Sequence, residues 1–416
     1  MQYKGRLFLA SLAFSAVANA SEPVEIPVID LPYNVQHGLR APSMEQSLAI
    51  TTDVYEVAHE KLWDAFSKRR WASKTAVAVF DLATTVILPV PFTDAWLHEE
   101  WHRAVLGRRG IGSFDDVYYF RVTDTIAVSH VRDEDLIKLK RDHPADQVRL
   151  QEAGIEGEYA MLQRLEKDRF FKGSRAWHLP LYWLVKINAQ GYVASGTSDE
   201  VNADTDKMNR EDGANIKKRD FTGHDFVGWM YDLSRPDEPY AARGVHPSGV
   251  GIDRYRKPSD LTPEERRFLR RQGQLQYLNF LDSNLIGIDA FHDVNVTAAH
   301  LLTSFGYTID ANVFLRGKRN LFIVVHDYKN RERHFPGADV QLLGNPMTVR
   351  VALWMQPEHQ RFRDTRGSPG GLVGVRFDRE RYFAEVEAKT RGWVQGVESI
   401  DPNVALRFGI TFRRRM

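Results

Sequence analysis

The chain has 416 residues, which is long for one ordinary domain and favours two. Its charge is nearly balanced, with 56 lysine and arginine residues against 55 aspartate and glutamate residues, so the composition gives no reason to expect nucleic-acid binding. The sequence contains no cysteine, which excludes cysteine nucleophiles, thiolate metal sites and disulfide bonds. Any metal site must therefore use histidine, aspartate or glutamate.

The first 20 residues have the three parts of a signal peptide. Lys4 and Arg6 supply a positive region, residues 7–17 (LFLASLAFSAV) supply an apolar run, and residues 18–20 (ANA) supply small residues at a cleavage site. The alternative is a buried N-terminal helix. We expect export, and an exported chain without cysteine is typical of a bacterial cell envelope.

Residues 75–92 (TAVAVFDLATTVILPVPF) form the most apolar later segment. Asp81 interrupts it and Pro89 and Pro91 end it, so its apolar length falls short of the roughly 20 residues that span a bilayer. We expect a buried helix that leads directly into the next one.

That next helix is expected over residues 94–106. Thr93 or Asp94 can cap its first turn with a side-chain oxygen, and Gly107 stands where a helix commonly ends. The helix carries two histidines four residues apart, His98 and His102, which therefore project from one face.

The spacing of these histidines suits zinc. Two neutral imidazoles and one further ligand leave a position open for water, which zinc acidifies, while a neighbouring carboxylate takes the proton. Residues 98–102 (HEEWH) resemble the His-Glu-x-x-His motif of the zincin metallopeptidases. The resemblance implies that His98 and His102 bind Zn²⁺, that Glu99 is the general base, and that the substrate is a peptide or protein. The alternative is a polar helix whose histidines pair with acidic neighbours.

A third ligand is expected on a downstream helix over residues 148–165. Gly154 and Gly157 in that helix indicate close packing against another backbone, because glycine within a helix otherwise costs about 1 kcal/mol. Zincins with a glutamate as third ligand, the gluzincins, place it on such a helix, although the interval here is longer than in thermolysin-like enzymes. We expect Glu156 as the ligand, with Glu152 as the alternative and an aspartate or histidine elsewhere as another.

The stretch from 194 to 262 is polar and rich in glycine, aspartate, asparagine and proline, so we expect it to be irregular. Its second half contains aromatic residues that favour an ordered loop over a scaffold. Four of its side chains are candidates to stabilise an oxyanion: His224, Arg243, His246 and Tyr255.

The last third alternates apolar and polar residues with a period of two, which predicts β-strands. The regular runs are 307–316, 347–355, 382–390 and 404–413, and the less regular runs are 284–291, 320–328, 336–343 and 371–378. About eight strands with an apolar and a charged face meet the lower size of an outer-membrane-type barrel, with lipid against the apolar face. A water-exposed antiparallel sheet with one buried face is the alternative.

Together these patterns predict an α+β protein. We expect a signal peptide (1–20), an N-terminal extension (21–49), a helical zincin-like domain (50–282) and a C-terminal antiparallel β region (283–416) that forms a small membrane-embedded barrel. The expected function is zinc-dependent peptide-bond hydrolysis at the bacterial cell envelope, in contact with outer-membrane lipid. The alternatives are a non-catalytic outer-membrane protein with a helical periplasmic binding domain, and a metal-dependent amidase acting on cell-wall material.

Overall fold

The computed structural model describes residues 24–37, 41–88, 90–119, 124–173, 178–285 and 293–412. The expected signal peptide lies outside these residues. Within them the chain forms ten α-helices: α2 (Tyr33–His37), α3 (Met44–Ala65), α4 (Arg70–Leu82), α5 (Asp94–Arg108), α6 (Asp133–Asp142), α7 (Pro144–Lys172), α8 (Leu179–Ser195), α9 (Glu200–Asp212), α10 (Asp225–Ser234) and α11 (Pro263–Leu275).

The described residues also form a nine-stranded sheet and a separate hairpin of β2 (Phe114–Tyr119) and β3 (Asp124–Ser129). Neighbouring strands of the large sheet are antiparallel, in the order β1-β11-β10-β9-β8-β7-β6-β5-β4. Its strands are β1 (Val24–Leu31), β4 (Val294–Thr303), β5 (Gly306–Leu315), β6 (Asn320–Lys329), β7 (His334–Leu343), β8 (Met347–Pro357), β9 (Gly367–Arg379), β10 (Tyr382–Lys389) and β11 (Asn403–Phe412).

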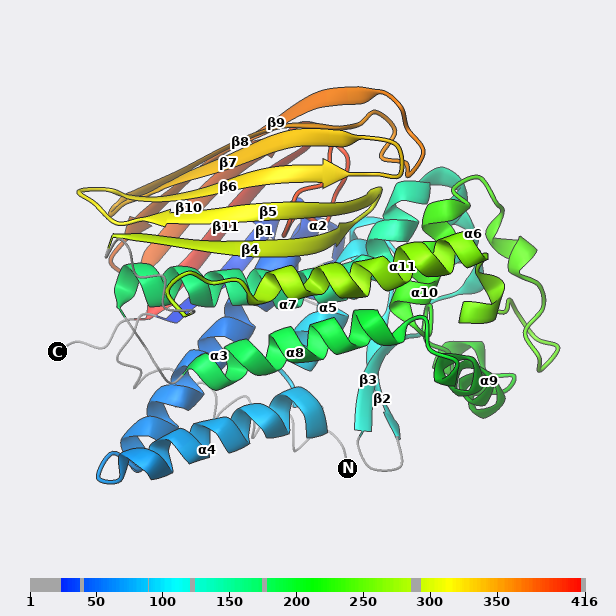
Figure 1. Ribbon diagram of the computed structural model, residues 1–416, viewed down its shortest axis with the longest axis horizontal. Coiled ribbons are helices and arrows are strands. Elements are labelled where there is room, and N and C mark those ends of the chain that lie inside the picture. The colour runs from blue at the N-terminus through cyan, green and yellow to red at the C-terminus, as the bar shows by residue number, and fades with distance from the viewer. Residues whose placement is uncertain are drawn as a thin grey trace.

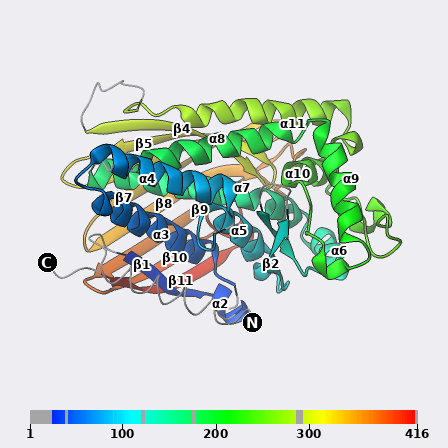
Figure 2. The ribbon, with the colours of Figure 1, turned by 90° about the horizontal axis from the view of Figure 1, so that it is seen from below.

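The sheet arches over a layer of helices (Figure 1). Helix α7 runs beneath the arch, α8 lies further from it, and α4 lies on the far side of the molecule. Seen from below, the helices stand in front of the sheet (Figure 2). The other face of the arch has no described helix or strand over it (Figure 1).

The expected closed barrel is wrong, because the sheet is open. Its edge strands, β1 and β4, do not pair with each other. Helix α3 packs against β1, and α7 packs against β4. The mixed α and β character is confirmed.

Most of the expected strands are present. β5, β8, β10 and β11 match the regular runs within a few residues, and β6, β7 and β9 match three of the less regular ones. The expected strand at 284–291 falls mostly outside the described residues, and the first strand of the region is β4. The sheet also contains β1, from the N-terminal extension, which the alternation did not indicate.

Two helical expectations need correction. The segment 75–92 forms the end of α4 and a π-helical turn (Ala83–Ile87), but only one side of it is buried: Val77 and Asp81 have no exposed surface, whereas Val79 is 60% exposed. The polar stretch 194–262 is not irregular throughout, because it contains α9 and α10. Helix α5 confirms the helix expected at 94–106, and α7 contains the one expected at 148–165. None of the helices in the described ranges is long and apolar enough to cross a bilayer.

A single large apolar core joins the helices to the sheet. Its largest side chains come from both sides of residue 283: Trp101 on α5, Trp229 on α10, Trp354 on β8 and Trp393 beyond β10. The helical and β regions therefore share one interior.

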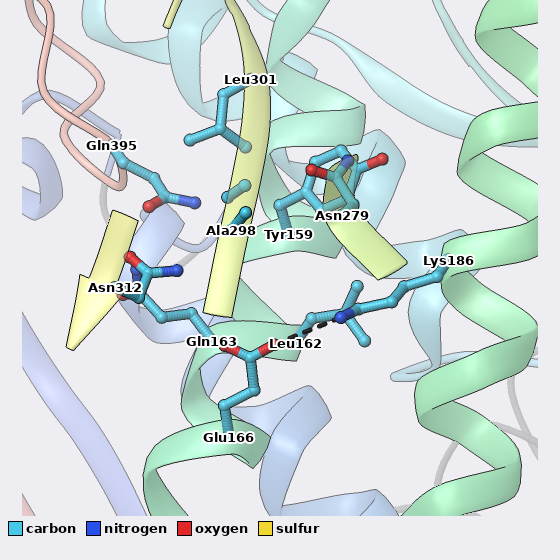
Figure 3. Close-up of a pocket in the computed structure, with 11 residues that line it drawn as sticks. Tyr159, Leu162, Gln163, Glu166, Lys186, Asn279, Ala298, Leu301, Asn312 and Gln395 are labelled. Carbon is cyan, nitrogen blue, oxygen red and sulfur yellow. Dashed lines mark hydrogen bonds and ion pairs between the residues drawn. The ribbon is translucent and has the colours of Figure 1, made fainter. Parts of the chain in front are cut away.

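A polar network also ties the helices to the sheet edge, around a cavity of about 20 Å³ (Figure 3). Lys186 of α8 lies 3.3 Å from the Glu166 carboxylate of α7, which also accepts hydrogen bonds from the Tyr182 hydroxyl (2.6 Å) and the Thr297 hydroxyl of β4 (3.0 Å). A polar space of this size suits a single water molecule. We regard it as a structural junction.

Candidate metal centre

Two helices bring three potential metal ligands together. His98 and His102 lie one turn apart on α5, and Asp225 is the first residue of α10. One ligand atom from each lies within 4.8 Å of the others. All three side chains are buried, with 7%, 1% and 5% of their surface exposed.

The outer ring nitrogen of each histidine is held by α7. His98 Nδ1 lies 2.8 Å from Glu158 Oε1, and His102 Nδ1 lies 2.5 Å from the carbonyl oxygen of Leu150. Both partners accept hydrogen bonds, so each Nδ1 donates a proton. This arrangement fixes the tautomer and turns Nε2 inward, as in histidines that bind metals through Nε2.

The inner nitrogens face the same carboxylate oxygen. Asp225 Oδ2 lies 3.1 Å from His98 Nε2 and 3.6 Å from His102 Nε2. Because the proton of His102 is on Nδ1, its Nε2 offers a lone pair, and this buried atom has no hydrogen-bond partner among the described residues. A lone pair facing a carboxylate calls for a cation between them.

The pKa shifts in the cluster also indicate that its carboxylates stabilise a positive charge at this position. Burial lowers the pKa of His98, but hydrogen bonds to Asp225 and Glu158 raise it well above its usual value. Burial raises the pKa of Asp225, but the neighbouring His102 and His98 hold it well below its usual range. Tyr192 of α8 donates a further hydrogen bond to Asp225 Oδ2 (2.9 Å), which fixes the carboxylate.

Space for the inner nitrogens comes from Gly154 on α7. A Cβ atom at this position would lie 2.3 Å from His98 Nε2 and 2.5 Å from His102 Nε2. Glycine is therefore required where α7 passes the centre, which explains its cost to the helix.

Glu99, the expected general base, is half-buried beside the cluster. Burial raises its pKa well above the usual value; the charge of His98 opposes this, and the carboxylates of Asp225 and Asp220 add to it. A dication nearby would shift the pKa back down and favour the ionised form.

The structure does not bring Glu156 or Glu152 to the histidines, which corrects the ligand set expected from the sequence. Glu156 lies 3.1 Å from Arg149 and accepts a hydrogen bond from the Gly396 amide (2.8 Å). Glu152 accepts hydrogen bonds from Arg149 (3.2 Å) and the Trp393 indole (2.9 Å). Each glutamate is two residues from Gly154, a rotation of about 200° on a helix, and so faces the opposite side.

Three of the four oxyanion candidates are engaged in structural contacts. Arg243 pairs with Asp232 (2.6 Å), His246 Nδ1 lies 2.9 Å from the Ser248 hydroxyl, and Tyr255 accepts a hydrogen bond from the Asp220 amide (2.8 Å). His224 directly precedes Asp225, and its Nε2 is buried with no hydrogen-bond partner in the described ranges.

The sequence held a signal for Glu158 but only a weak one for Asp225. Residues four apart share a helix face, so the close approach at Gly154 places Glu158 and Leu150 toward the histidines. Asp225 follows a run of glycine and polar residues at a helix start, and no spacing rule connects it with the motif. The sequence pattern therefore pointed to a glutamate on α7 and not to Asp225.

The donor set fits zinc. Two imidazole nitrogens and one carboxylate oxygen, with outer hydrogen bonds in place, are a ligand combination found in catalytic zinc sites with an open position. Comparison with known proteins adds no identity: no family model, no curated protein and no solved structure matches the chain.

Proposed function

We propose that the chain is a zinc-dependent hydrolase of peptide bonds in a zincin-like arrangement. His98, His102 and Asp225 hold the zinc ion, and Glu99 is the general base. The observation that carries the proposal is the buried His102 Nε2, which has a lone pair, no hydrogen-bond partner among the described residues, and a carboxylate oxygen 3.6 Å away.

Each protein group has a separate task. Zinc, when bound, supplies Lewis acidity that acidifies water and polarises a carbonyl oxygen. Glu99 accepts the proton of the attacking water and returns it to the leaving amine. Glu158 and the Leu150 carbonyl keep both imidazoles in the metal-binding tautomer, and Tyr192 orients Asp225.

The test is Glu99→Gln, assayed for zinc content and for hydrolysis of a mixed peptide library. Loss of the base should lower kcat by about 10² to 10⁴, while zinc remains bound because Glu99 is not a ligand. Glu134→Gln, at an exposed position on α6, is the matched control and should leave both properties unchanged.

The opposite result would favour a non-catalytic binding protein. If the wild-type chain binds zinc but no library peptide is cleaved, or if Glu99→Gln cleaves as fast as the wild type, Glu99 is not a base for peptide hydrolysis. Including cell-wall peptides in the library separates an amidase of that material from a general peptidase.

A further inference from the structure

The outward face of the large sheet is apolar over seven adjacent strands. Register places one continuous row across β5 to β11: Val313, Ile323, Val340, Val351, Val373, Ala388 and Val404. A second row runs parallel to it: Leu315, Leu321, Leu342, Val349, Val375, Val386 and Leu406. Leu353 of β8, two residues beyond Val351 and on the same face, is 66% exposed.

The inward face of the same sheet carries charged side chains beside the residues that it contributes to the apolar core. Arg350 pairs with Asp339 (2.7 Å) and Glu387 (3.3 Å), and Arg407 pairs with Glu385 (2.7 Å). These side chains line a cavity of about 1020 Å³ between the sheet and α7. A sheet surrounded by water presents polar side chains outward, whereas the outward face of this sheet is apolar and its charged side chains point inward.

The size of the apolar face limits what can cover it. Contiguous exposed apolar patches on monomers surrounded by water seldom exceed a few hundred Å², and larger ones mark a partner or a membrane. Seven strands are too broad for one docked helix. A curved, smooth surface of valine and leucine needs no shape-matched partner if hydrocarbon chains cover it.

One end of this face is basic. The turn between β5 and β6 contains Arg316, Lys318 and Arg319, and the end of β9 and its turn into β10 contain Arg379 and Arg381. All five are exposed, and Glu380 is the acidic residue among them. Antiparallel pairing puts both turns at the same end of the sheet, where anionic headgroups would meet them.

We propose that the outward face of β5 to β11 docks into the hydrocarbon layer of a lipid bilayer, with the basic turns against anionic headgroups. Alternating strands with an apolar outer and a polar inner face are the pattern of lipid-facing sheets. The first row continues onto β4 at Val296, which is 42% exposed, and the second row continues onto Val294 of β4 and Leu31 of β1. This inference does not depend on the proposed catalysis.

The test is flotation of the full chain with vesicles in a density gradient, which separates lipid binding from aggregation. The double variant Val351→Glu, Val386→Glu places charge in both rows and should reduce the floating fraction about tenfold or more. The matched control Val35→Glu, Val245→Glu alters residues that are 76% and 70% exposed on the helical side, and should float like the wild type.

Vesicle composition tests the headgroup contact. The wild-type chain should bind vesicles with phosphatidylglycerol more strongly than vesicles of phosphatidylcholine alone, and added salt should remove the difference. Circular dichroism and cooperative unfolding establish that each variant is folded. The proposal fails if the folded wild type does not float with either vesicle, or if the double variant floats equally well. A dimer that the same variant dissociates, without flotation, would show that a second copy covers the face.

Discussion

Gly154 decides how closely α7 approaches the two histidines of the candidate centre. The position has no side chain, and the inner nitrogens of His98 and His102 occupy the space that a Cβ atom would take. The contact is at once a packing feature and a determinant of metal geometry.

We predict that Gly154→Ala lowers zinc affinity about tenfold or more, because the added methyl group displaces an imidazole from its ligand position. Alanine otherwise favours a helix by about 1 kcal/mol, so the loss cannot be a propensity effect. A competition titration with a chromophoric chelator measures it. Gly191→Ala on α8 is the control, since its Cβ meets nothing within 4 Å, and an equal loss there would refute the argument.

A second buried pair, Asp81 and His59, lies outside the candidate centre. Asp81 Oδ1 is 2.5 Å from His59 Nε2, and both residues have no exposed surface. Burial raises the pKa of Asp81 to about 8, against the Leu181 amide, which lowers it. Burial lowers the pKa of His59 to about 3. Both groups are therefore neutral in the folded chain at neutral pH.

The sign of the pH dependence follows from Asp81. The folded chain keeps this proton up to about pH 8, whereas the unfolded chain loses it near pH 4, so stability falls as pH rises between those values. His59 has the opposite slope below about pH 6.5, where the unfolded chain gains a proton that the folded chain does not. The two slopes cancel at mildly acidic pH.

We predict that the wild-type chain loses stability relative to Asp81→Asn, by up to about 1.4 kcal/mol per pH unit, as pH rises from about 5 to about 8. Asparagine keeps the shape and cannot ionise. Urea unfolding of both chains across this range gives the difference, and a constant difference would show that Asp81 is ionised in the folded state.

Sequence reasoning found the histidine pair and placed Glu99 beside it, because both follow from helical spacing over five residues. It did not find Asp225, since the approach of α10 to α5 depends on packing between segments far apart in the chain. Glu152 and Glu156 were expected as ligands because they lie on the downstream helix with Gly154 and Gly157, where gluzincins place a glutamate. Their role is to hold Arg149 and the segment around Gly396.

At the scale of elements, helix α7 has two buried faces that contact different parts of the molecule. One face presents Leu150, Gly154 and Glu158 to α5, and the opposite face presents Glu152 and Glu156 to the loop after β10. Its low amphipathicity follows from this double burial, because neither face meets water. One face therefore contributes to the candidate centre, and the opposite face contributes to the contact with the sheet region.

The alternation of apolar and polar residues predicted which segments form strands, but it did not predict how the strands assemble into a sheet. Period two tells which side chains share a face, and β5, β8, β10 and β11 follow it. It does not tell how many strands join or whether the edges meet, and here α3 and α7 occupy the edges. The sequence did not predict β1, because Pro27 interrupts a short run of alternating residues. It did not predict α9, because the residues of this helix are almost all polar and show no apolar face.

Helix α11 begins with a capping box formed by Thr262 and Glu265, and its contribution to stability can be tested by mutation. Thr262 accepts a hydrogen bond from the Glu265 amide, and the Glu265 carboxylate accepts one from the Thr262 amide (2.8 Å). We predict that Thr262→Ala lowers the unfolding free energy by about 1 kcal/mol, and that Thr262→Ser restores most of it. Chemical denaturation of the three chains measures this, and a Thr262→Ser chain as unstable as Thr262→Ala would exclude the cap as the cause.

At the scale of the whole molecule, the candidate centre links α5 to α10 across more than a hundred residues of chain. A metal that binds only the folded chain stabilises it by mass action. The candidate ligands therefore have a measurable effect on global stability as well as on catalysis.

We predict that zinc at about 100 times its Kd stabilises the wild-type chain by about 2.7 kcal/mol and raises its Tm, and that a chelator reverses this. Glu156→Gln should keep the zinc response despite a lower Tm, because it breaks a buried ion pair without touching the metal. Asp225→Ala should lose the response. Differential scanning calorimetry compares the three, and a zinc response lost in Glu156→Gln but kept in Asp225→Ala would restore Glu156 as ligand.

The pairing of β1 with β11 joins the two ends of the described chain, from Val24 against Phe412 to Leu31 against Leu406. A ribosome delivers β1 well before β11, so β1 has no partner in the sheet until β11 has been made. During that interval its free backbone groups can pair with other chains, which makes it a natural binding site for chaperones. A chain that terminates before β11 keeps β1 unpaired and so differs from a chain that contains β11 in a way that quality-control proteases can recognise.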